Sequence, residues 1–139
     1  RDSGGAQVIV ADSTLVAGFV FPEDSFHQVA RAVREKDGDW RCPELIFSEV
    51  RSVGLKSRTR KIPLDTIIAR CNLAANAVSV YRMHNHSVLS VAEAGGLWVY
   101  DAEYVALARQ LAVTLVTCDA EVLKKFPALA LSPEQFLKK

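Results

Sequence analysis

The chain has 139 residues, of which 50% are hydrophobic and 24% charged, and its net charge is +1 at pH 7. This length suits one domain with a single core, and the composition excludes a disordered chain. The small net charge provides no bulk attraction to nucleic acid, and no apolar run approaches the roughly 18 residues of a membrane-spanning helix.

The three cysteines, Cys42, Cys71 and Cys118, are scattered along the chain and form no CxxC pair. This spacing argues against a disulfide framework and fits a reducing compartment, so we expect a cytoplasmic protein without a membrane partner. Residues 1–6 are polar and are expected to be a flexible N-terminal arm or a remnant of cloning. Residues 7–139 are expected to form one domain.

Strands and helices alternate along this predicted domain. Short apolar runs predict strands at residues 8–11, at the start of WRCPEL (40–45), at 78–81 and at 113–117. Amphipathic segments predict helices over 13–21, from Asp24 or Ser25 to Gly38, from Pro43 through Val53, from about Leu64, over about 87–94, over 101–112, over 119–127 and over 132–139. This alternation predicts an α/β fold, a three-layer α/β/α sandwich around a mostly parallel sheet of four or five strands.

Two of the predicted strands end on an aspartate. The run VIVA is followed by Asp12 and two hydroxyl residues, and the run TLVTC is followed by Asp119. A carboxylate is costly to bury unless it is paired or holds a cation, so both should lie just past their strands, at the sheet edge where α/β folds bind ligands. Asp12 alone is explained as well or better by a helix cap. The repeat of the arrangement favours a site.

Two further acids are expected at the same edge. Asp101 starts a helix after a glycine-containing connection, and Glu49 lies one turn into the helix that follows WRCP. Four carboxylates that converge repel one another and raise one another's pKa values. A divalent cation with oxygen ligands removes this conflict, and Mg²⁺ or Mn²⁺ suits carboxylates with retained waters.

Four stretches carry a resemblance to a known family: VADSTLV, CPELIFSEV, YDAEYVALARQL and LVTCDAEVL. In their order and spacing they resemble the PIN-domain ribonucleases, in particular the small VapC-type toxins. By position, the resemblance implies a PIN-like domain over residues 7–139 whose catalytic acids are Asp12, Glu49, Asp101 and Asp119. The chain departs from the family pattern at Trp98, where a small hydroxyl residue is usual.

The resemblance implies hydrolysis of RNA phosphodiester bonds with Mg²⁺ or Mn²⁺ as the cofactor. Asp12, Asp101 and Asp119 would be ligands of the ion, directly or through water, and Glu49 would join them or orient a bound water. The implied partners are an RNA substrate and a cognate antitoxin, and the apolar surplus of the chain leaves room for a homodimer.

Two threonines are candidates for supporting the acids. Thr14 lies two residues after Asp12, and Thr117 lies two residues before Asp119. Each could hold a carboxylate or a phosphate oxygen by a hydrogen bond. A local cap explains Thr14 equally, and a strand position explains Thr117.

A basic run follows Glu49: Arg51, Lys56, Arg58, Arg60 and Lys61. It is a candidate contact for the RNA backbone, because it would neutralise phosphates near the acids. A solvated helix face is the commoner explanation of such a run.

Two other functions remain open. Aspartyl phosphotransfer of the haloacid dehalogenase kind expects a second aspartate two residues after the first, where this chain has Thr14. A non-catalytic binding module would keep the fold without the chemistry, and the retention of all four acids argues against it.

Overall fold

The structure is a computed structural model that describes residues 7–57 and 61–139. The expected N-terminal arm and two residues of the basic run, Arg58 and Arg60, lie outside the described residues. Within the described part of the chain, no helix combines the length and hydropathy needed to cross a membrane.

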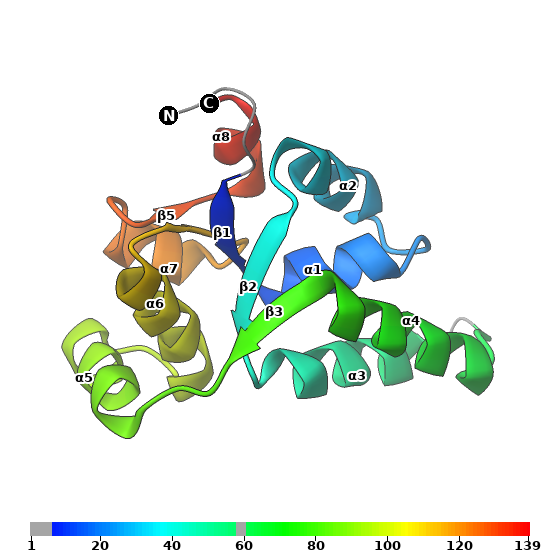
Figure 1. Cartoon of the computed structure of the whole chain (residues 1–139), viewed down its shortest axis with the longest axis horizontal. Coiled ribbons are helices and arrows are strands. Elements are labelled where there is room, and N and C mark those ends of the chain that lie inside the picture. The colour runs from blue at the N-terminus through cyan, green and yellow to red at the C-terminus, as the bar shows by residue number, and fades with distance from the viewer. Residues whose placement is uncertain (1–6, 58–60) are drawn as a thin grey trace.

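Strands and helices alternate as the sequence predicted (Figure 1). The strands are β1 (Val8–Ala11), β2 (Asp39–Pro43), β3 (Val78–Tyr81), β4 (Thr114–Val116) and β5 (Ala130–Leu131). The helices are α1 (Ser13–Val20), α2 (His27–Lys36), α3 (Ile46–Lys56), α4 (Leu64–Ala77), α5 (Asn85–Gly95), α6 (Val99–Leu111), α7 (Ala120–Lys125) and α8 (Pro133–Leu137).

The five strands form one sheet in the order β3-β2-β1-β4-β5, and every pair is parallel. The chain builds outward from β1 to β3, then crosses back and builds from β4 to β5 on the other side. Strand order therefore reverses between β1 and β4, which is the point where open α/β sheets bind ligands. The sheet is an all-parallel version of the predicted one.

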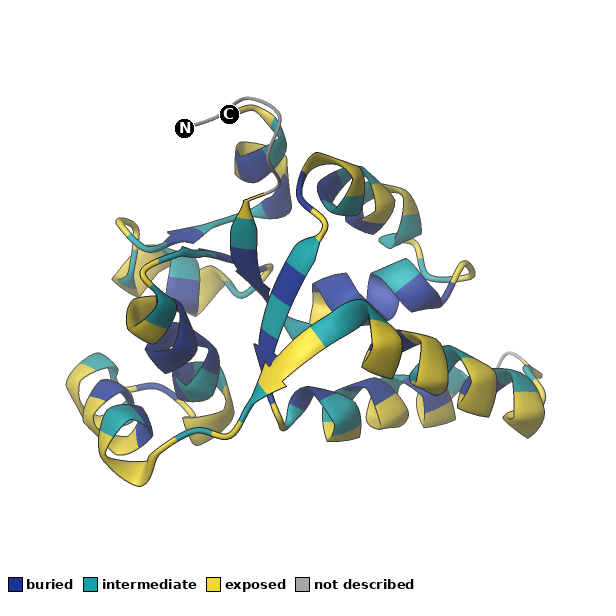
Figure 2. Cartoon of the chain, in the orientation of Figure 1, coloured by how far each residue is buried: buried dark blue, intermediate teal, exposed yellow. Residues whose placement is uncertain are grey.

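Helices cover both faces of this sheet (Figure 1). Helices α1 to α4 lie on one side, and α5 and α6 lie on the other. The α6 helix packs across β1, β2 and β4, and α8 packs beside α2 and β5. These layers explain why β1 is apolar at successive positions, with Ile9, Val10 and Ala11 each no more than 1% exposed (Figure 2).

Three of the local predictions that differ from the structure concern β5, Pro43 and the start of α2. The two-residue β5 strand was missed because it is too short to show a periodic pattern. Pro43 ends β2 instead of starting a helix, because β2 continues beside Tyr81 of β3 and α3 begins only at Ile46. The α2 helix begins at His27 and not at Asp24 or Ser25. The Asp24 carboxylate instead accepts a hydrogen bond from the backbone N–H of Phe26 in the turn before the helix.

Candidate active site

A cavity of about 300 Å³ opens at the carboxyl ends of β1 and β4. Four acids from four separate segments line it: Asp12, Glu49, Asp101 and Asp119. Thr14, Tyr104 and Thr117 belong to the same lining. The four carboxylates that the sequence predicted to converge therefore surround one space.

Asp12 lies just past β1, where its backbone N–H donates to the carbonyl of Val116 on β4. Its Oδ1 accepts a hydrogen bond of 3.0 Å from the backbone N–H of Leu15 and caps α1. Its Oδ2 accepts from the Thr117 hydroxyl at 2.8 Å and from the backbone N–H of Cys118 at 2.9 Å. Asp12 therefore both caps α1 and lines the cavity, the two roles that the sequence analysis gave as alternatives.

Asp119 repeats this arrangement at the end of β4. Its carboxylate caps α7 by accepting from the backbone N–H of Val122 at 2.9 Å. Its own backbone N–H donates to the Thr117 hydroxyl at 3.1 Å, while that hydroxyl donates to Asp12. Thr117 is 3% exposed and fixes the two aspartates relative to each other.

Glu49 and Asp101 reach the cavity from the first turns of α3 and α6. The Tyr104 hydroxyl donates to Glu49 Oε1 at 2.5 Å, and Tyr104 is 5% exposed. The sequence analysis did not place Tyr104 in the site. Its position three residues after Asp101 is the signal that could have found it, because such residues share a helix face.

Thr14 differs from Thr117. It lines the cavity and is exposed, but its hydroxyl makes no hydrogen bond to any residue within 7–57 and 61–139. The sequence also missed the backbone N–H of Cys118, because no side-chain pattern reports a main-chain donor.

Burial, with a smaller effect of neighbouring negative charges, raises the pKa values of three of the acids: Asp12, Glu49 and Asp101. Burial raises the pKa of Asp12 above its usual value, and hydrogen bonds from Cys118, Leu15 and Thr117 offset part of this effect. Burial also raises the pKa of Glu49 and of Asp101, and the negative charges of their neighbours add to the effect. Keeping these groups ionised together at neutral pH therefore costs free energy, which a bound cation would recover.

The donor set suits a hydrated, oxygen-seeking ion. The cavity lining contains no basic side chain among the described residues, and none of the four acids forms an ion pair with them. No three acidic, histidine or cysteine side chains in the described ranges stand close enough for a ready-made metal cluster. Mg²⁺ usually takes only one or two carboxylates and keeps several waters, so this wider arrangement fits such an ion.

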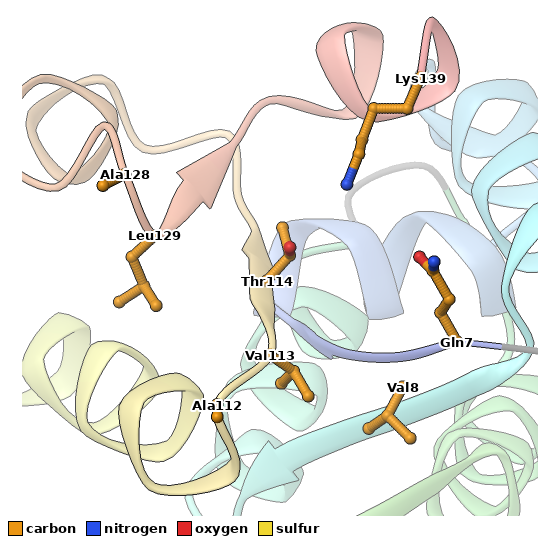
Figure 3. A pocket seen from close by; sticks show the side chains of 8 residues that line it. All are labelled: Gln7, Val8, Ala112, Val113, Thr114, Ala128, Leu129 and Lys139. Carbon is orange, nitrogen blue, oxygen red and sulfur yellow. The ribbon is translucent and has the colours of Figure 1, made fainter. Parts of the chain in front are cut away.

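A second cavity, of about 520 Å³, lies at the opposite edge of the sheet (Figure 3). It is lined by the first residues of β1 and β4, by loop residues before β5, and by Lys139 (Figure 3). Its described lining carries no acidic side chain. This edge therefore lacks the chemistry of the first cavity, despite the greater volume.

The described members of the basic run lie outside the acid cavity. Arg51 and Lys56 are exposed on α3, and Lys61 is exposed in the turn before α4. Arg51 follows Glu49 by two residues and so points away from the Glu49 side of the helix.

An all-parallel sheet with a carboxylate-lined cavity at its switch point defines a class of α/β domain built around an acidic site. Within this class, the model of the PIN domain matches residues 9–129, and the chain belongs to the PIN domain family. The resemblance to this family inferred from the sequence is confirmed.

Relatives from Pyrobaculum aerophilum and Mycobacterium tuberculosis are similar to this chain. Ribonuclease VapC3 of P. aerophilum is 25% identical over an alignment of 126 residues that covers 87% of this chain and 96% of that protein. The crystal structure of P. aerophilum PAE2754 has a TM-score of 0.69 at 23% identity, covering 96% of this chain and 93% of that one. The M. tuberculosis toxin VapC20, which cleaves the sarcin-ricin loop, has a TM-score of 0.62 at 15% identity, with coverage of 82% and 91%. The two structures show a shared fold.

Proposed function

We propose that this chain is a Mg²⁺- or Mn²⁺-dependent endoribonuclease and the toxin of a toxin–antitoxin pair. The observation that carries the proposal is the meeting of four carboxylates, from four separate segments, around one cavity whose described lining has no basic side chain. The similarity to ribonuclease VapC3 supports RNA as the substrate.

The cation would be held by Asp12, Asp101 and Asp119, in part through its coordinated waters, with Glu49 as a further ligand or as a partner for water. Both oxygens of Asp12 already accept hydrogen bonds. The carboxylate of Asp101 and the second oxygen of Asp119 are therefore the oxygens most available to bind a metal ion. When bound, the ion would offset negative charge on the phosphoryl group and lower the pKa of a coordinated water.

The protein's own groups have separate tasks in this proposal. Thr117 holds Asp12 and the backbone of Asp119 in one arrangement, so the two carboxylates enter the cavity at a fixed spacing. Tyr104 occupies one oxygen of Glu49 and leaves Oε2 to hold the proton that an attacking water gives up. Burial moves the pKa of Glu49 upward, toward the range in which a carboxylate works as a general base.

The structure gives little support to aspartyl phosphotransfer. A nucleophilic carboxylate needs an oxygen that can reach phosphorus, and both oxygens of Asp12 accept backbone or hydroxyl hydrogen bonds. Thr14 occupies the place of the second aspartate that this chemistry expects.

A cleavage assay tests the proposal against a non-catalytic binding module. Purified wild type, Asp12→Asn, Asp101→Asn and the control Asp65→Asn would be incubated with structured RNAs in Mg²⁺, in Mn²⁺ and in a chelator. Asp65 is exposed at the start of α4 and matches the test residues in charge. We expect cleavage in metal by the wild type and the control, with a loss of at least 100-fold in both test variants. Equal cleavage by all four proteins would indicate a contaminant and remove the assignment.

The proposed partners follow from the same assignment. A cognate antitoxin would bind the toxin and block cleavage, and a small neighbouring gene for a DNA-binding protein would support this pairing. Arg51 and Lys56 are the described candidates for contacting the RNA backbone, with Lys61 beside them, and such contacts would make KM rise with salt. The free thiols Cys42, Cys71 and Cys118 agree with a cytoplasmic location. A homodimer is tested by light scattering.

A further inference from the structure

Trp98 is the residue in this region that neither the fold nor the acid site explains. It is 78% exposed, and it stands immediately before α6, whose first turn carries Asp101. Tyr100 is 61% exposed in the same turn. Large aromatic side chains normally contribute stability by burial, so a solvated tryptophan here does not stabilise the core.

Trp98 also fails to serve its helix. It occupies the N-cap position of α6 and makes no side-chain capping hydrogen bond. Serine, threonine, asparagine or aspartate at this position would satisfy a free backbone N–H of the first turn. The residue is therefore unfavourable for local structure at a position where a small hydroxyl residue would do better.

The helix register places Trp98 beside the acid cavity. Asp101 is the third residue of α6, and side chains at the N-cap and third positions lie on the same side of a helix's first turn. Asp101 lines the acid cavity and Trp98 lies outside this lining, so the register puts the indole beyond the cavity on the side of α6 that Asp101 occupies. A flat aromatic face next to a nuclease site matches the groups on which proteins stack unpaired bases.

We propose that Trp98 is a stacking platform for an unpaired base of the RNA substrate, next to the bond that is cut. This inference rests on the proposed function for its choice of RNA as the ligand. The exposed apolar surface that Trp98 forms with its chain neighbours Val99 and Tyr100 is small, which favours a nucleotide over a second copy of the chain. A stable protein interface instead uses about 20–30 residues a side.

Tryptophan fluorescence tests this stacking without relying on cleavage. The chain has two tryptophans, and Trp40 is 1% exposed, so an added oligonucleotide can reach Trp98 but not Trp40. Wild type in Mg²⁺ would be mixed with a single-stranded oligoribonucleotide, and emission would be recorded in the first milliseconds, before turnover. We expect quenching by the single strand, little quenching by a duplex of the same sequence, and loss of the signal in Trp98→Phe.

Kinetics of a matched set of variants provide the second readout. Trp98→Ser removes the ring but supplies a helix cap, so the variant should fold at least as stably as the wild type. Its KM for unpaired RNA should rise about tenfold with kcat little changed, while Trp98→Phe should keep KM within about twofold. The control Leu73→Ser removes an apolar side chain that is 51% exposed on α4, and its KM should be unchanged.

The outcomes separate this inference from the proposed function. Cleavage without quenching, and with the same KM in Trp98→Ser, overturns the stacking and leaves the nuclease in place. Quenching by unpaired RNA without any cleavage supports the stacking and removes the nuclease. A change of oligomeric state in Trp98→Ser with unchanged KM and no quenching would assign the face to contacts between copies and overturn the stacking.

Discussion

Thr117→Val is the substitution that most directly probes how the two strand-end aspartates are held. Valine has nearly the shape of threonine, so the buried site at the end of β4 stays filled and the main change is the loss of the hydroxyl. The change removes the hydroxyl that donates to Asp12 Oδ2 at 2.8 Å and accepts from the Asp119 N–H at 3.1 Å. Both lost hydrogen bonds involve aspartates that line the acid cavity.

The expected cost follows from these two hydrogen bonds. A hydrogen bond to a charged group contributes about 1.5–3 kcal/mol, and an unsatisfied N–H costs about 1–3 kcal/mol when it is buried. Asp12 keeps two backbone donors, and water in the cavity can reach the Asp119 N–H, so we take the lower half of each range. The free energy of unfolding should fall by about 2.5–4 kcal/mol, which lowers Tm by roughly 6–16 °C for a domain of this size.

Activity should change in a defined direction as well. The Thr117 hydroxyl lowers the pKa of Asp12, so its removal raises that pKa, and the acid limb of the kcat/KM profile should move to higher pH. A support of this kind is usually worth about 10- to 100-fold in activity. Denaturant unfolding and a pH profile of RNA cleavage measure both effects, with Thr117→Ser as the variant that keeps the hydroxyl and Thr66→Val, on α4 and outside the cavity lining, as the matched control. Thr117→Val with the stability and acid limb of the wild type would refute the reasoning.

Three further predictions test other parts of the site and fold. Tyr104→Phe removes the donor to Glu49, so the Glu49 pKa should rise, kcat/KM should fall about tenfold, and stability should fall by about 1 kcal/mol; an unchanged pH profile would contradict this role. Asp101→Asn should raise stability at neutral pH in a chelator by up to about 1 kcal/mol, discounted for partial exposure. The sign follows because the native state holds the Asp101 proton more tightly than the unfolded chain, so this group's contribution is lost as pH rises above the unfolded value of about 3.9. The stability advantage of Asp101→Asn over wild type should therefore shrink as pH falls toward that value. Thermal melts across pH measure this difference, and an advantage that does not change with pH would contradict the prediction. Ala112→Gly should stabilise the chain by about 0.5–1 kcal/mol in urea unfolding, because Ala112 adopts φ 56° at the end of α6; a loss of stability would contradict this.

The sequence predicted the sheet edge well because the relevant signals are local. Apolar runs that end on Asp12 and Asp119 indicate strands followed by carboxylates, and parallel pairing then forces their ends to one edge. The helix that carries Asp101 begins two residues earlier than predicted, at Val99, because Trp98 and Val99 show no cap signal. Glu49 was placed at the same edge by its position one turn into the helix that follows WRCP, and the family pattern then implied its catalytic role.

The remaining features depend on contacts between distant segments. The Tyr104 bond to Glu49 joins α6 to α3, residues 55 apart in sequence. The β5 strand exists because Leu115 and Thr117 of the β4 segment donate backbone hydrogen bonds to residues 129 and 131. Neither contact leaves a pattern within one segment, so sequence alone could not assign them.

Binding of Mn²⁺ tests most directly whether the four acids share one cation site. Free Mn²⁺ would be followed by electron paramagnetic resonance while the ion is titrated into wild type, Asp101→Asn and Asp65→Asn, without RNA. The account predicts that wild type and Asp65→Asn bind the ion equally and that Asp101→Asn binds it at least tenfold more weakly. Equal binding by all three proteins would place the ion elsewhere and contradict the central claim.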